Sequence, residues 1–116
     1  MPASRNPLVR LHHIRDEIEG ISAALRGIDH RIFVESYVLR RAAERALLII
    51  SEAARSLPDD IIRRYPEIDW AGVRGLGNVL RHDYQMVDPD TLWEIVTRKV
   101  PELAPVIARM IRELMT

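Results

Sequence analysis

Apolar residues recur at spacings of three and four along nearly the whole chain, which is the period of one face of an α-helix. The first such segment runs from Leu8 to Leu25, with charged residues on its other face and Gly27 placed to end it. The next segment, from Arg31 to Leu57, is the longest; Asp29 is placed to cap it and Pro58 to close it. These two segments predict two amphipathic helices.

The side chains of the segment 31–57 indicate which side of that helix is buried. Its apolar stripe consists of Phe33, Tyr37, Leu39, Ala43, Leu47, Ile50 and Ala54. Glu52 falls within this stripe, where a buried carboxylate requires a hydrogen-bonded or charged partner. We therefore expect Glu52 to have a structural partner.

The second half of the chain is divided by prolines. A short helical turn is predicted after Pro58, up to Tyr65. A turn then begins at Pro66, and Asp69 is placed to cap a helix that ends at about His82.

Glycines at positions 72, 75 and 77 lie inside this predicted helix, where each costs about 1 kcal/mol relative to alanine. They indicate either close approach of another backbone or a loosened first turn. A last helix is predicted from Pro89 to Leu114, with Pro101 expected to kink or divide it.

The pattern as a whole predicts an all-α fold. No segment alternates apolar and polar residues with the period of two that a strand requires, and we find no internal repeat. The chain has 116 residues, enough for one hydrophobic core and too few for two. We expect an antiparallel bundle of four to five helices that forms a single domain over residues 1–116.

Charge and composition narrow the class of function. The 17 basic and 17 acidic residues cancel, so any RNA contact must come from a local patch. The same balance, and the lack of a basic recognition helix, argue against a DNA-binding regulator. Without cysteine there is no thiolate metal site, and a reducing cytoplasm fits. We expect neither a signal peptide nor a membrane span.

The most informative segment is Asn78-Val79-Leu80-Arg81-His82-Asp83-Tyr84, which gathers an amide, an imidazole and a phenol within two helical turns. Asn78 and His82 are four residues apart, so a helix places both on one face, about 6 Å apart along its axis. Tyr84 follows near the expected end of the helix. The pattern predicts a polar site cut into an apolar helix face.

Several fragments together resemble the HepT-like branch of the HEPN superfamily, the toxin half of a two-gene toxin–antitoxin module. The fragments are Ile50-Ser51-Glu52-Ala53-Ala54, Pro66-Glu67-Ile68-Asp69-Trp70, Leu76-Gly77-Asn78-Val79-Leu80-Arg81-His82-Asp83-Tyr84, and Val87-Asp88 before a closing helix with Trp93. In this order they cover roughly residues 8 to 114.

The resemblance implies a helical homodimer with a metal-independent ribonuclease site, without a cofactor, at or near the dimer interface. The family signature is an arginine, a polar residue, three further residues, a histidine, one residue and a tyrosine. Asn78, His82 and Tyr84 match it, whereas the arginine position is occupied by Gly77. The implied catalytic positions are therefore Gly77, Asn78 and His82.

The missing arginine bears directly on the chemistry. Cleavage of RNA without a metal can use the 2′-hydroxyl as nucleophile, with a histidine that titrates near neutral pH as base or acid. It also needs a cation to stabilise charge on the phosphoryl oxygens. Loss of one such preorganised donor typically costs about 10²–10³ in rate.

Three explanations for Gly77 are open. Arg74 or Arg81, three and four residues away, contacts RNA in place of the motif arginine. Alternatively, the protein is a natural pseudo-enzyme, or the glycine is an inactivating change. We favour the last two jointly, because the sequence shows no packing gain that would offset a glycine in mid-helix.

Tyr84 has a further role that the resemblance implies. In HepT-like pairs, a small nucleotidyltransferase of the MNT type silences the toxin by transferring adenylate to this tyrosine. A phosphate beside His82 adds negative charge and bulk where the RNA phosphate must sit. The competing hypothesis is a non-catalytic dimeric helical module that binds the nucleotidyltransferase, or a nucleotide, and does not cut RNA.

The remaining histidines and the tryptophans have simpler interpretations. His12 and His13 are adjacent, so on a helix they point about 100° apart and do not chelate together. His30 is isolated, and no metal site is predicted. Trp70 and Trp93 are expected to anchor the core or an interface.

Overall fold

A computed structural model of the chain describes residues 6–82 and 88–116, with the backbone alone for Val79, Arg81 and His82. Within these ranges every regular element is helical, which confirms the predicted all-α class. The longest helices are α1 (Pro7–Ala24), α3 (Tyr37–Arg55), α5 (Trp70–His82) and α7 (Val100–Met115). Shorter ones are α2 (His30–Glu35), α4 (Asp59–Ile62) and α6 (Pro89–Glu94), and a π-helical segment, η3 (Ile95–Lys99), joins α6 to α7.

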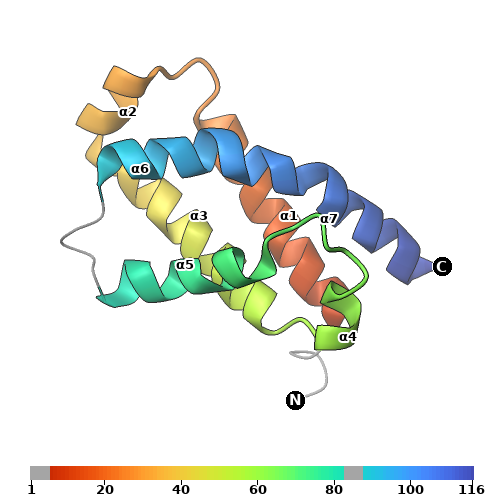
Figure 1. Ribbon diagram of the computed structural model, residues 1–116. Helices are drawn as coiled ribbons and strands as arrows, with labels where there is room; N and C mark the ends of the chain where they lie inside the picture. Colours follow the sequence, from red (N-terminus) through yellow and green to blue (C-terminus); the bar gives the residue numbers. More distant parts are fainter. Residues whose placement is uncertain (1–5, 83–87) are drawn as a thin grey trace.

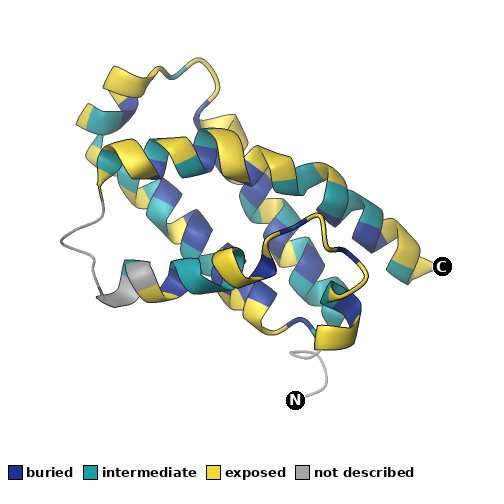
Figure 2. Cartoon of the chain, in the orientation of Figure 1, coloured by how far each residue is buried: buried dark blue, intermediate teal, exposed yellow. Residues whose placement is uncertain are grey.

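The helices form a bundle in which α1 packs between α3 and α7, and α3 in turn packs against α5 (Figure 1). The elements α6, η3 and α7 form one continuous helical run, drawn in shades of blue in that view. Buried residues recur along each of these helices, coloured dark blue in Figure 2. The largest fully buried ones include Leu11, Ile14, Phe33, Leu47, Ile50, Leu92, Ile107 and Met110.

Local capping signals behave as the sequence predicts. Gly27 adopts a positive φ of 78° just after α1, a conformation that glycine tolerates without steric cost. The carboxylate of Asp29 accepts a hydrogen bond of 2.9 Å from the amide of Ile32 at the start of α2. Asp69 accepts one of 3.1 Å from the amide of Gly72 at the start of α5. These contacts confirm all three predicted helix ends.

The prediction of one helix over Arg31–Leu57 is wrong, because the chain breaks at Ser36. This residue has an extended backbone with φ −98° and ψ 111°, and it both ends α2 and caps α3. Its hydroxyl accepts a hydrogen bond of 3.1 Å from the amide of Leu39, which is the interaction that makes serine favourable at such a position. Tyr37 consequently begins α3 and is 64% exposed rather than part of the apolar stripe.

The polar position in the stripe of α3 is Ser51, not Glu52. Ser51 is fully buried, whereas Glu52 is exposed. One residue along a helix corresponds to a rotation of about 100°, so a small error in the predicted stripe exchanges a buried position for a solvated one.

The break expected near Pro101 is the π-helical segment η3, which ends two residues before it. Proline lacks an N–H, and its ring conflicts with the carbonyl four residues earlier, here that of Thr97. A π-helical turn is one way in which a helix absorbs such a local disturbance. The helix thus changes to π-helical geometry before Pro101 but is neither divided nor ended there.

Both tryptophans contribute to packing, as predicted. Trp70 is buried, and its indole N–H donates a hydrogen bond of 2.9 Å to the carbonyl of Tyr65. Trp93 on α6 lies against Phe33 on α2, with ring centroids 5.2 Å apart. None of the helices in the described ranges is long and apolar enough to cross a lipid bilayer.

Candidate active site

The position of α5 is fixed where it crosses α3. The buried hydroxyl of Ser51 donates a hydrogen bond of 2.8 Å to the carbonyl of Arg74 and accepts one of 2.9 Å from the amide of Gly77. Gly77 is itself buried. The backbone amide of position 77 is thus bonded to a side chain of the neighbouring helix, a contact that the sequence does not reveal.

The other two glycines of α5 differ from Gly77. A Cβ added at Gly72 would lie 2.4 Å from the carboxylate of Asp69, so this glycine makes room for the cap. A Cβ added at Gly75 would meet nothing within 4 Å. The first turn of the helix therefore concerns Gly72, whereas the open space around Gly75 shows no close approach of another backbone.

Asn78 lies one residue beyond this crossing and is exposed. Its side-chain oxygen accepts a hydrogen bond of 3.2 Å from a guanidinium nitrogen of Arg55, the last residue of α3. Arg55 is exposed and lies one helical turn after Ser51, so both residues project from the side of α3 that meets α5. Arg55 cannot be selected from the sequence, because nothing local links it to a motif 23 residues away.

A shallow groove of about 360 Å³ opens beside this contact. It is lined by Arg55, Ala71, Arg74, Gly75 and Asn78. Two arginines, an asparagine and two small residues thus line the groove. Such a surface combines positive charge, hydrogen-bonding groups and space, as a phosphate-binding groove requires.

Arg74 lies in the wall of this groove, but its guanidinium is engaged with the end of α3. It donates hydrogen bonds of 3.0 Å to the carbonyl of Ala54 and of 2.9 Å to that of Leu57, and it pairs with Asp59 at 3.5 Å. The carbonyl of Ala54 also accepts from the amide of Leu57, so the guanidinium adds a hydrogen bond there and holds the turn that follows α3. The structure therefore gives Arg74 a stabilising role whether or not it contacts RNA.

The other predicted site residues fall at or beyond the limit of the described structure. His82 is the last residue of α5, four positions after Asn78. The side chains of His82 and Arg81 lie outside the described residues, and so does the whole of Tyr84. That Asn78 and His82 share one face stays a prediction from their spacing, as do the roles of Arg81 and Tyr84.

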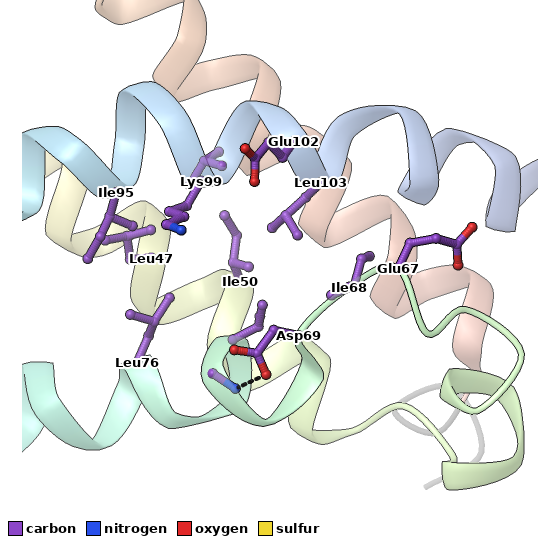
Figure 3. Close-up of a pocket in the computed structure, with 13 residues that line it drawn as sticks. Leu47, Ile50, Glu67, Ile68, Asp69, Leu76, Ile95, Lys99, Glu102 and Leu103 are labelled. Atoms are coloured by element: carbon purple, nitrogen blue, oxygen red, sulfur yellow. Dashed lines mark hydrogen bonds between the residues drawn. The ribbon is translucent and has the colours of Figure 1, made fainter.

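A second cavity, of about 310 Å³, lies on the opposite side of α5, between this helix, α3 and the η3–α7 run (Figure 3). Its walls are mainly apolar, with Leu76 of α5 facing Leu47, Ile95 and Leu103, and with Lys99 and Glu102 also present. Neither Gly77 nor Asn78 lines it. We therefore place the candidate site in the basic groove and not in this cleft.

The loop that leads into α5 is fastened to α7 by two polar contacts. The hydroxyl of the buried Tyr65 donates a hydrogen bond to Glu113, and Arg109 pairs with Glu67. The bond to Glu113, with burial, raises the pKa of Tyr65 above its usual value. The bond from Arg109 lowers the pKa of the Glu67 carboxyl. Because this loop leads into α5, its attachment to α7 sets where α5 begins. It thereby also sets where along α3 the groove lies.

The family described as "Ribonuclease HepT-like" matches residues 14–110, a span that includes α3, α5 and the groove between them. The chain belongs to this ribonuclease HepT-like family. The predicted resemblance is thereby confirmed, and the HepT-like match covers most of the domain rather than the motif alone.

Similar proteins cover most of the length of the chain. It is 36% identical over 93 residues to "Probable ribonuclease HepT" of Thermococcus cleftensis, covering 80% of this chain and 84% of the relative. It is 30% identical over 109 residues to "Putative RNase TTE0752" of Caldanaerobacter subterraneus subsp. tengcongensis, covering 94% of this chain and 97% of the relative. No solved structure matches the chain at a comparable level of significance.

Proposed function

We propose that this HepT-like protein is the toxin of a HEPN/MNT-type toxin–antitoxin module and acts in the cytoplasm as a metal-independent endoribonuclease. Membership of a ribonuclease family supports RNA as the substrate class. The observation that carries the proposal is the groove beside Asn78, where a motif amide, a guanidinium and open space lie together. Its position one helical turn from His82 in the chain is the one that the motif requires.

In the proposed reaction, the 2′-oxygen of the substrate attacks the adjacent phosphorus and the bond from phosphorus to the 5′-oxygen breaks. The products are a 2′,3′-cyclic phosphate and a 5′-hydroxyl end. His82 accepts the proton of the 2′-hydroxyl or delivers one to the leaving oxygen, since an imidazole is competent for both near neutral pH. Asn78 orients the phosphate by hydrogen bonding.

Position 77 carries no cation, because the glycine that occupies it has no side chain. This missing motif arginine favours the alternative function, a non-catalytic dimeric module that binds a nucleotidyltransferase or a nucleotide.

The proposal includes two partners. One is a second copy of the chain, because the family site lies at or near a dimer interface. The other is a cognate MNT-type nucleotidyltransferase, which silences the toxin by adenylylation (AMPylation) of Tyr84. We propose no DNA target and no membrane partner.

Expression of the native chain without its partner, followed by growth curves and RNA cleavage assays, tests the function. Growth arrest with cleavage is expected, and both should disappear in His82→Ala. The Gly77→Arg variant, which has the motif arginine, is assayed in parallel so that its rate of RNA cleavage can be compared with that of the native chain. If neither the native chain nor Gly77→Arg cuts structured or unstructured RNA, while the nucleotidyltransferase still binds, the non-catalytic module is the correct interpretation.

A further inference from the structure

We infer that Arg55 supplies the cation that binds the scissile phosphate, in place of the arginine that the family motif has at position 77. This inference rests on the proposed ribonuclease function and names the residue that would make it work in this chain. It concerns a residue of α3, outside the motif helix, that no part of the motif specifies.

The first argument is the position of Arg55. Its guanidinium is 3.2 Å from the side-chain oxygen of Asn78, so the charge lies at the motif without a change in the fold. Its side chain is exposed and borders the groove. A guanidinium presents several N–H groups in a planar fork, so one can hold Asn78 while others face a phosphate oxygen.

The second argument is that polar groups at the neighbouring positions already have partners within the protein. The amide of Gly77 is bonded to the buried hydroxyl of Ser51. The guanidinium of Arg74 bonds two carbonyls at the end of α3 and pairs with Asp59. Of the two arginines that line the groove, Arg55 is therefore the one whose described contact is with the motif itself.

The third argument is space. The small residues Ala71 and Gly75 also line the groove, and a Cβ at Gly75 would still meet nothing within 4 Å. A phosphodiester can thus approach Arg55 and Asn78 from the open side. Arg74 adds a second positive charge in the wall, which strengthens the local field even though its hydrogen bonds point to α3.

The test compares Arg55→Gln and Arg55→Lys with Arg45→Gln, which removes the same charge from an exposed position elsewhere on α3. Cleavage is measured under single-turnover conditions. Binding is measured with a 2′-O-methyl RNA oligonucleotide, which lacks the internal nucleophile and so reports affinity alone. Thermal melting monitored by circular dichroism shows that each variant is folded.

We expect Arg55→Gln to lower the cleavage rate by about 10²–10³, as for loss of one charge-stabilising donor. Its binding should show a salt dependence shallower by about 0.7 in log–log slope, the loss of one phosphate contact on a single strand. Arg55→Lys should be intermediate, because it keeps the charge and loses the fork. Arg45→Gln should behave as the native chain does.

The outcomes separate this inference from the proposed function. If the native chain cleaves RNA and folded Arg55→Gln cleaves equally well, the role of Arg55 is overturned and the nuclease function stands. If the native chain binds the oligonucleotide through Arg55 but cleaves nothing, the groove stands as a phosphate site and the nuclease function falls. If the native chain neither binds nor cleaves, both are overturned.

Discussion

The hydroxyl of Ser51 and the amide of Gly77 join α3 to α5 through a buried hydrogen bond of 2.9 Å. The same hydroxyl donates to the carbonyl of Arg74, so a single side chain bonds two backbone groups of the motif helix. A buried polar group of this kind stabilises a fold only when its hydrogen-bonding capacity is used, as it is here.

Replacing Ser51 with alanine should lower the free energy of unfolding by about 1–2 kcal/mol, because the amide and the carbonyl lose a buried partner. Urea denaturation of the native and variant chains measures the difference. Ser56→Ala is the control, since the hydroxyl of Ser56 bonds a carbonyl of its own helix at an exposed position. If Ser51→Ala and Ser56→Ala lowered the free energy of unfolding equally, the role of Ser51 in joining α3 to α5 would be contradicted.

Substitutions at two glycines of α5 should have opposite effects. Gly75→Ala should raise the free energy of unfolding by about 0.5–1 kcal/mol, because alanine has the higher helix propensity and its Cβ meets nothing within 4 Å. Gly72→Ala should lower it, because the new Cβ would lie 2.4 Å from the capping carboxylate of Asp69. Thermal melts of both variants decide this, and stabilisation by both would show that the cap is dispensable.

Replacing Arg74 with glutamine should destabilise the protein by about 1–2 kcal/mol, after allowance for the 27% exposure of its side chain. The reason is the loss of hydrogen bonds to the carbonyls of Ala54 and Leu57. Arg63→Gln, at an exposed position after α4, is the control and should change stability little. If Arg74→Gln weakens RNA binding while its melting curve is unchanged, its main role is in the groove and not at the end of α3.

Acid should weaken the attachment of the loop before α5. The pKa of Glu67 is lowered by its hydrogen bond with Arg109, so folding favours the ionised carboxylate. This stabilisation is present above the ordinary pKa of 4.5 and is lost as the pH falls through the lower pKa of the folded state. The melting temperature of Glu67→Gln should therefore be lower than that of the native protein at neutral pH. This difference in melting temperature should vanish well below pH 4.5. A difference that does not depend on pH would exclude the ion pair as its cause.

Incubation with the cognate nucleotidyltransferase and ATP should add the mass of one or more adenylyl groups to the native chain. Intact-mass spectrometry measures the gain, and Tyr84→Phe should show none. Tyr65→Phe is a suitable control, because Tyr65 is buried and bonded to Glu113. The modification is ruled out at this residue if the native chain gains no mass or if Tyr84→Phe gains as much.

The features predicted correctly are those set by neighbouring residues. Gly27, Asp29 and Asp69 end or cap helices through contacts within a few positions, and such signals are legible in the sequence. The break at Ser36 was missed because apolar spacing continues across it, while the side chain of this residue caps the next helix.

The candidate site was predicted only as far as the motif extends. Asn78 was found from its spacing to His82, and the structure places it on the surface beside a basic groove. Arg55 was not found, because its contact with Asn78 depends on how α3 crosses α5. The bond between the amide of Gly77 and Ser51 likewise joins two helices and has no local signal in the sequence.

Ser51 and Arg55 are four residues apart on the same face of α3. The hydroxyl that holds α5 and the guanidinium beside Asn78 are therefore displaced together whenever α3 shifts. A shift of α3 by a single residue would turn this face by about 100° and displace it by about 1.5 Å. The hydroxyl and the guanidinium would then be withdrawn from α5 together. Insertions or deletions within this stretch of α3 should thus be far more harmful than point changes on its solvated side.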